Sequence, residues 1–377
     1  MPVSLISNRS HHAMRPAGRR ACDGPSVEFE KQPPVSIAIG LVNNMSDGAL
    51  EATERQFISL LDAASEGISV RLSFYSLPGI RRNGPVARHV DNFYSSTEDL
   101  ANTRLDALIV TGREPLTPNL ADEPYWKSFT AVLEWTRENT YSTVWSCLAA
   151  HAAILHMDGI ARVKSAQKRS GVFECARVSD HPLIAGAPSC FQLPHSRWNG
   201  IREQDLLASG YTVLTRTADA GVDTFVRQQK SLFVFFQGHP EYESNTLLLE
   251  YRRDVGRYFR GETDAYPSMP QGYFGPATAA ALQALQSEAM TCPREGLLAE
   301  ISGALEKAKV ESIWHTTAAC IYRNWLEYLC AQKQLPAARS QVAGEVDVLG
   351  TPTPLMVPAR EIPGVGVYAA GQDRPRP

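Results

Sequence analysis

The sequence predicts an α/β fold, in which a mostly parallel sheet is covered by helices on both faces. Two observations predict it. Short apolar runs rich in β-branched residues alternate with helical segments over 35–157, and the connections between them are short. Parallel neighbours in a sheet need a crossover, usually a helix, so this order suits a parallel sheet. Because such sheets bind ligands beyond the carboxyl ends of their strands, residues that follow a strand are candidates for a site.

The first half of the chain supplies the parallel strands and their helices. A loop over 43–48 joins the first strand to the first helix, and a Gly-, Pro- and Arg-rich loop over 78–85 follows the second strand. Strands are expected over 35–42, 70–76, 105–110 and 143–146, and helices over about 50–65, 125–139 and 147–157.

The second half is expected to be mixed. Short strands and turns over 201–236 predict an antiparallel extension that ends in the buried strand Phe233–Phe236. A Gly-, Pro- and Ala-rich segment over 262–290 becomes helical toward its end. Further helices are expected over about 244–260 and 313–334.

Three residues at two strand ends are candidates for catalysis. Cys147 stands at a predicted strand-to-helix turn, and His239 and Glu241 follow the strand Phe233–Phe236. A helix N-terminus favours the nucleophilic thiolate, and its free backbone N–H groups can hold an oxyanion. In an extended His-Pro-Glu segment, residues i and i+2 project to the same side, so Glu241 can orient the imidazole. The set has the types of a nucleophile, a base and an orienting acid.

Each of these residues also has a purely structural interpretation. Free Cys is among the most buried residue types, and Cys147 taken alone indicates a core position. A His before a Pro at a strand end is a common loop feature. The functional hypothesis depends on the combination, because a Cys turn and a His-x-Glu at two strand ends fit one site on a parallel sheet.

The composition limits the kinds of partner. The chain has 377 residues, 44% hydrophobic and 20% charged, with net charge -3 and a pI near 6.3. This balance gives no electrostatic support for a nucleic acid or an anionic membrane as partner, so a small-molecule substrate is expected. The seven cysteines include no CxxC pair and no His spacing suited to zinc, so no metal site is predicted. Reduced thiols in the cytoplasm are expected.

Both ends are expected to lie outside the folded domain, which is placed at residues 35–334. The leader, 1–34, has four arginines but no apolar run that could form a signal-peptide core or span a bilayer. It is expected to be disordered, with an Arg-rich targeting peptide as the alternative. The Pro-rich tail, 335–377, is expected to be linker-like or disordered.

Several short motifs, in order along about 35–333, resemble one known family. The chain is similar to the homoserine O-acyltransferases of the MetA type, the homoserine O-succinyltransferases and their acetyl-transferring relatives. The resemblance implies a class I glutamine-amidotransferase-like fold, a flavodoxin-like three-layer sandwich. The matching motifs are Thr53–Phe57, Asn92–Tyr94, Leu108–Gly112, Tyr125–Trp126, Leu133–Trp135, Trp145–Cys147, Ser170–Glu174, Pro194–Arg197, Gly238–Tyr242 and Asn324–Leu326.

The resemblance implies catalytic roles. Cys147 matches the acyl-thioester nucleophile, His239 the proton acceptor, and Glu241 the acid beside it. The implied reaction is ping-pong acyl transfer in methionine biosynthesis, with succinyl-CoA or acetyl-CoA as co-substrate and no bound cofactor. The acceptor is the hydroxyl of homoserine, and the oligomeric state is left open, a homodimer included.

The resemblance also implies residues that bind the amino-acid substrate. Lys168 matches a substrate-binding lysine, and Ser196 and Arg253 match positions that contact the amino acid. These types suit a zwitterion, because a carboxylate needs a fixed cation and an Arg can meet it in a bidentate fork. Surface or packing roles are the alternative.

Two loops depart from the family. The loop after the first strand usually carries lysines, but 45–51 has none. The position that separates donors, glycine for succinyl and glutamate for acetyl, falls on Leu116. Arg113 could pair with a succinyl carboxylate, which favours succinyl-CoA, while Glu114 complicates that assignment.

Three other functions therefore stay open. One is acyl transfer to serine or another hydroxy amino acid. Another is a glutaminase of the amidotransferase type, although such enzymes usually have Gly-x-Cys-x-Gly where this chain has Trp145 and Ala149. The third, of a different class, is an inactive paralogue that binds a metabolite.

Overall fold

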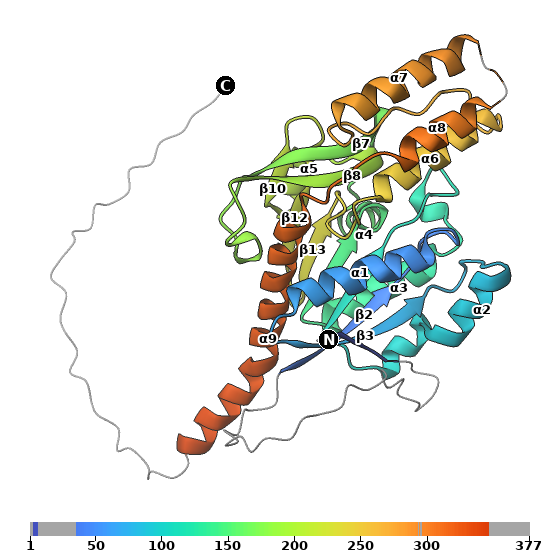
Figure 1. Ribbon diagram of the computed structural model, residues 1–377. Helices are drawn as coiled ribbons and strands as arrows, with labels where there is room; N and C mark the ends of the chain where they lie inside the picture. The colour runs from blue at the N-terminus through green and yellow to red at the C-terminus, as the bar shows by residue number, and fades with distance from the viewer. Residues whose placement is uncertain (1–2, 7–34, 293, 295, 347–377) are drawn as a thin grey trace, which may run out of the picture. The chain divides into compact units, whose positions relative to one another are not determined.

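The computed structural model describes residues 3–6, 35–292, 294 and 296–346 (Figure 1). The chain divides into a large compact unit, Met1–Gln334, and a small one, Leu335–Pro377. Every strand described here belongs to the large unit. Among the described residues, no helix combines the length and the apolar character needed to cross a membrane.

A nine-stranded sheet forms the centre of the large unit. Six neighbouring strands, β1, β3, β2, β5, β6 and β13, run parallel. Strands β12 and β9 extend the sheet beyond β13 and run antiparallel to their neighbours. The predicted mostly parallel α/β sheet is therefore confirmed. In order across the sheet the strands are β1 (Val3–Leu5), β3 (Ser69–Ser76), β2 (Ser36–Val42), β5 (Ala107–Thr111), β6 (Ser142–Ser146), β13 (Leu232–Phe236), β12 (Thr224–Gln228) and β9 (Thr212–Val213), with β4 (Tyr94–Ser96) also paired to β3.

Helices cover both faces of this sheet, as predicted (Figure 1). One apolar core joins the sheet to α1, α6, α8 and α9, and the other joins it to α3 and α4. Adjacent residues of β6 point to opposite cores: Val144 to the first and Trp145 to the second. The helices are α1 (Leu50–Ala64), α2 (Gly84–Phe93), α3 (Trp126–Asn139), α4 (Leu148–Asp158), α5 (Glu203–Ala208), α6 (Thr246–Phe259), α7 (Pro276–Thr291), α8 (Leu297–Glu306) and α9 (His315–Val346).

The register of the three central strands builds the floor of the site. Thr111 of β5 and Phe236 of β13 both lie opposite Ser146 of β6. The three strands therefore end at one level, and the residues that follow them, Gly112, Cys147 and Gln237, emerge side by side. Parallel pairing brings together segments that are far apart in the sequence.

A separate four-stranded antiparallel sheet lies beside this end of the molecule. Its long hairpin joins β7 (Val163–Arg177) to β8 (Cys190–Gly200), and β10 (Thr215–Thr217) and β11 (Gly221–Val222) complete it. Sequence analysis missed this hairpin because much of β7 is polar and exposed and has no two-residue alternation of apolar side chains. It carries Lys168 and Ser196.

The predicted chain ends need correction. Disorder of the leader was wrong for Val3–Leu5, which form β1 and pair in parallel with the edge of β3. The tail was expected to be linker-like or disordered from 335, but α9 continues to Val346. The rest of both predictions, at 1–2, 7–34 and 347–377, lies outside the described residues.

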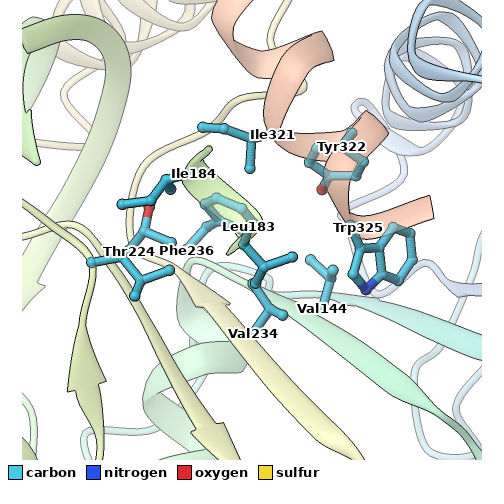
Figure 2. Close-up of a pocket in the computed structure, with 10 residues that line it drawn as sticks. Val144, Leu183, Ile184, Thr224, Val234, Phe236, Ile321, Tyr322 and Trp325 are labelled. Atoms are coloured by element: carbon cyan, nitrogen blue, oxygen red, sulfur yellow. The ribbon is translucent and has the colours of Figure 1, made fainter. Parts of the chain in front are cut away.

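One small apolar cavity lies between the sheet and α9 (Figure 2). Its volume of about 10 Å³ has room for about one water. The lining combines Val144, Val234 and Phe236 from the sheet with Tyr322 and Trp325 from α9. We interpret it as a packing gap, because neither its size nor its apolar lining suits a substrate.

Candidate active site

Cys147 occupies a strained turn between β6 and α4, as predicted. Its φ of 52° makes it, among the described residues, the one non-glycine with positive φ. Its N–H donates to the carbonyl of Phe236 at 2.7 Å, which ties the turn to the end of β13. Strain of this kind is held at functional sites because it directs the side chain out of the sheet.

The first N–H groups of α4 lie open beside the thiol. Those of Leu148 and Ala149 cannot bond within the helix, since the first turn lacks acceptors. Gly112 keeps them accessible: a Cβ there would lie 2.7 Å from the Leu148 nitrogen and 2.9 Å from that of Ala149. Gly112, Leu148 and Ala149 also line a small pocket with Arg113 and Tyr125. The arrangement can hold an oxyanion.

His239 reaches the same turn from the end of β13. Its Nδ1 donates to Glu241 Oε1 at 2.8 Å, and Ser146 Oγ donates to the same oxygen at 3.3 Å. The ring stacks on Tyr242 with centroids 4.1 Å apart. Nδ1 is therefore committed to the carboxylate, and Nε2 is the nitrogen left for the thiol.

His239 is electrostatically coupled to Cys147 as well as to Glu241. Burial alone would lower the pKa of His239. The negative charges of Glu241 and Cys147, together with hydrogen bonds to both, outweigh burial and hold that pKa well above its ordinary value. The imidazolium form of His239 is therefore favoured. The structure thus joins Cys147, His239 and Glu241, as the hypothesis of one site requires.

A cluster of charged and polar groups lies beside the triad, centred on Glu250 of α6. Ser196 Oγ donates to Glu250 Oε2, and the Tyr242 hydroxyl donates to Oε1 at 2.7 Å. Lys168 Nζ lies 3.6 Å from Glu250 Oε2 and 2.9 Å from Asp254 Oδ2. Two of the predicted substrate-binding residues, Lys168 and Ser196, therefore meet at one carboxylate.

The third, Arg253, is at the edge of this cluster. Its side chain is 47% exposed, and its Nε donates to Asp254 Oδ1 at 2.9 Å. Burial alone would raise the pKa of Asp254, but Lys168 and Arg253 outweigh it and hold that pKa below its ordinary value. Arg253 is thus held by its neighbour and keeps part of its guanidinium toward solvent.

Sequence analysis missed Tyr242 and Glu250. Tyr242 touches both parts of the site, since it stacks on His239 and donates to Glu250. The available signals were its place directly after Glu241 and the i, i+4 spacing of Glu250 and Asp254, which puts both carboxylates on one helix face.

The loop after β5 carries Leu116, the residue at the position expected to separate acyl donors, together with Arg113 and Glu114. Leu116 is 65% exposed, and its N–H donates to Glu123 Oε1 at 2.7 Å. Arg113 lines the pocket at the first turn of α4. Glu114 pairs with Arg257 of α6 at 3.2 Å. Arg113, rather than Leu116, therefore lines the pocket beside the first turn of α4.

The loop at 45–51, which has no lysine, is bound by an arginine from another segment. Arg82, which follows β3, donates to the carbonyls of Asn43 and Met45 and pairs with Asp47 at 3.3 Å. The positive charge of Arg113 is near enough to help lower the pKa of Arg82, after the larger effect of burial. Two arginines thus supply positive charge beside this lysine-free loop.

One buried group of metal-ligating types lies behind His239. The ligand atoms of Cys175, His195 and Asp223 lie within 4.8 Å of one another. The sequence predicted no metal site, because it has no CxxC pair and no His spacing suited to zinc. The three residues of this group come from separate segments. The hydrogen bonds of the group are considered further below.

Comparison with known proteins identifies the family. A family model described as homoserine O-succinyltransferase matches residues 28–335. The chain belongs to that family. It is 48% identical over 297 residues to a homoserine O-succinyltransferase of Rhodopseudomonas palustris, covering 78% of this chain and 89% of that protein. A second, of Bradyrhizobium japonicum, is 43% identical over 320 residues, covering 84% and 95%. The resemblance and the enzyme class, a transferase, are thereby confirmed.

Solved structures with similar folds include glutamine amidotransferases. One from Thermotoga maritima is 13% identical with a TM-score of 0.42, covering 79% of this chain and 99% of that one. Another, from Methylobacillus flagellatus, is 15% identical with a TM-score of 0.42, covering 78% and 94%.

Proposed function

We propose that this chain transfers a succinyl group from succinyl-CoA to the hydroxyl of L-homoserine, through a thioester on Cys147. The observation that carries the proposal is the contact of His239 with Cys147 at a turn that also presents free N–H groups. The family and its named relatives support the reaction. Succinyl-CoA acts as a co-substrate, and the product would serve methionine biosynthesis.

The first half-reaction forms the acyl-enzyme. The Cys147 thiolate attacks the thioester carbonyl of the donor, and the oxyanion is bound by the N–H groups of Leu148 and Ala149. When the tetrahedral intermediate collapses, the carbon–sulfur bond to CoA breaks. The His239 imidazolium can give its proton to the leaving thiolate, so CoA departs as a thiol.

The second half-reaction uses the same histidine as a base. Neutral His239 takes the proton of the acceptor hydroxyl while its oxygen attacks the thioester, and Glu241 stabilises the imidazolium that forms. General-base help of this kind is typically worth about 10²–10⁴ in rate. Collapse releases the ester and regenerates the Cys147 thiolate beside the imidazolium.

The cluster around Glu250 suits the acceptor's zwitterionic end. Lys168 and Arg253 supply cations for the α-carboxylate, and Glu250, held by Ser196 and Tyr242, offers an anion for the α-ammonium. Tyr242 also stacks on His239, which sets the distance between this cluster and the base. A bound amino acid would thus present its hydroxyl toward His239.

Positive charge near the nucleophile favours a succinyl over an acetyl donor. Arg113 lines the pocket beside Leu148, and Arg82 lies close enough to interact with it. A succinyl group carries a free carboxylate that such charges can bind, whereas an acetyl group has none. Glu114 is engaged by Arg257 and does not oppose this arrangement.

Four mixtures test the proposal. Succinyl-CoA or acetyl-CoA is combined with homoserine or serine, and CoA release is followed by a thiol reagent. We expect the fastest turnover with succinyl-CoA and homoserine, and its loss in Cys147→Ala. Faster turnover with acetyl-CoA or serine would overturn the donor or the acceptor assignment. Ammonia release from glutamine without CoA would favour the amidotransferase alternative, and no turnover in any mixture would favour an inactive paralogue.

A further inference from the structure

The backbone that carries His239 is held by Asp223, a residue outside the catalytic triad. Asp223 follows β11 and is fully buried. Its carbonyl accepts from the Gln237 N–H at 3.0 Å, and its carboxylate Oδ1 accepts from the Gly238 N–H at 3.0 Å. On the other side, the His239 N–H donates to the carbonyl of Pro194 at 2.8 Å. Three consecutive N–H groups are thereby fixed.

Gly238 fits this clamp only because it lacks a side chain. A Cβ at Gly238 would lie 2.7 Å from Asp223 Oδ1, 3.1 Å from His195 Nε2 and 3.1 Å from the Pro194 carbonyl oxygen. The backbone of the His239 turn is therefore pressed against the carboxylate. Small movements of Asp223 would be transmitted through Gly238 to the imidazole of the next residue, His239.

The carboxylate of Asp223 is itself fixed on every side. Thr215 Oγ1 donates to Oδ2 at 2.8 Å, and Thr224 Oγ1 donates to Oδ2 at 2.7 Å. His195 Nε2 lies 3.4 Å from Oδ1. Burial raises the pKa of Asp223, and the hydrogen bonds from Thr224, Thr215 and Gly238, with the charge of Arg197, oppose that rise.

Arg197 determines which ring nitrogen of His195 carries the proton. Its Nε donates to His195 Nδ1 at 3.3 Å, and a guanidinium has no acceptor, so Nδ1 must carry the lone pair. The proton of the neutral ring is then on Nε2, which faces Asp223. Burial holds the pKa of His195 well below its ordinary value, so the ring stays neutral. Arg197 thus donates to His195, and His195 Nε2 approaches Asp223 Oδ1 at 3.4 Å without forming a hydrogen bond to it.

We propose that Asp223 is a positioning residue that, through Gly238, sets the imidazole of His239 against Cys147. Arg197 and His195 hold its charge in place from the other side. The same residues offer an alternative, a metal ion bound by Cys175, His195 and Asp223. That arrangement would require the lone pair of His195 on Nε2 and a proton on Nδ1, directly opposite the Arg197 donor, so the bond from Arg197 to Nδ1 disfavours a metal ion there.

The test measures the chemical reactivity of Cys147. It rests on the proposed function only in taking Cys147 and His239 as the catalytic pair. Iodoacetamide alkylation is measured against pH by mass spectrometry of the peptide that contains Cys147, with no substrate present. In the wild type, the imidazolium should keep Cys147 reactive near pH 6. Asp223→Ala should lower that rate at least tenfold, and kcat about 10- to 100-fold, with KM for homoserine within about twofold.

Matched variants separate positioning from folding and from metal binding. Asp223→Asn keeps an oxygen that can accept from Gly238 and should recover most of the loss. Cys175→Ala should match the wild type. Should Asp223→Ala fail to fold, Thr224→Val should still lower alkylation near pH 6 about threefold.

Three results would overturn the proposal. One is a folded Asp223→Ala, or a Thr224→Val, with a wild-type alkylation profile. Another is an Asp223→Asn as impaired as Asp223→Ala. The third is protein-bound zinc, by elemental analysis of the purified enzyme, that is lost with reactivity in Cys175→Ala. A wrong donor or acceptor assignment would leave the alkylation result unchanged, so the two proposals fail separately.

Discussion

Replacing Glu241 by Gln would remove the charge beside His239 and keep nearly the same shape. The amide oxygen of Gln can still accept from His239 Nδ1, which now lies 2.8 Å from the carboxylate. Both side chains are almost fully buried, so solvent screens the pair weakly. At an effective dielectric constant of about 20, unit charges about 4 Å apart attract by about 4 kcal/mol, or about a thousandfold in an equilibrium constant.

The rate should fall by up to that factor, because the imidazolium that forms during acyl transfer loses this stabilisation. We expect kcat for Glu241→Gln to drop roughly 100- to 1000-fold, with KM for homoserine little changed. Since Glu241 raises the pKa of His239, its loss should also move the acid limb of kcat to lower pH. The assay is steady-state CoA release against pH.

The control is Glu243→Gln, which makes the same charge change two residues further along the same loop, where no ion pair of the side chain is observed among the described residues. It should keep wild-type kcat. A wild-type kcat in Glu241→Gln would refute the reasoning. So would a large loss of melting temperature with normal activity in the folded protein, because Glu241 would then be structural.

Three further perturbations test other parts of the site. Gly112→Ala should slow acyl-enzyme formation and cost about 1–3 kcal/mol of stability, because its Cβ would lie 2.7 Å from the Leu148 nitrogen. Stopped-flow CoA release would measure the rate, and urea unfolding would measure the stability. Wild-type values in both assays would exclude an oxyanion site there. Glu250→Gln should raise KM for homoserine at least tenfold, since a hydrogen bond to a charged group is worth about 1.5–3 kcal/mol. CoA release without acceptor should stay normal. An unchanged KM would show that Glu250 is not part of the acceptor site. His239→Gln tests linkage: because the folded pKa of His239 is raised, the stability it contributes is fully present below about pH 6.5 and is lost as pH rises through the folded pKa. Urea unfolding near pH 6 and pH 9.5 should show a gap between wild type and variant that narrows at the higher pH, and a gap that widens would contradict the shift.

Much of the fold could be predicted from the sequence because the central strands are buried on both faces. Ser36–Val42, Ala107–Thr111 and Leu232–Phe236 are continuous apolar runs, which the parallel strands of a covered sheet require. The turn at Cys147 followed from a β-branched run that ends directly before an Ala-rich segment. Such local signals also placed His239 at the correct strand end.

The rest depended on contacts between distant segments. The hairpin of β7 and β8 has little apolar periodicity, and its position is fixed by pairing and by the bond of the His239 N–H to Pro194. Asp223 gave no signal, since a buried carboxylate between two short strands resembles a surface residue in sequence. Arg82 was equally hidden, because its role depends on the path of the loop at 43–47 that it binds.

Trapping of the acyl-enzyme tests the central claim most directly. The protein is incubated with succinyl-CoA alone, quenched in acid and digested, and the peptide that contains Cys147 is examined by mass spectrometry. We expect a succinyl adduct on that cysteine that disappears when homoserine is added before the quench. Undiminished turnover in Cys147→Ala, or an adduct on another residue with Cys147 unmodified, would contradict the account.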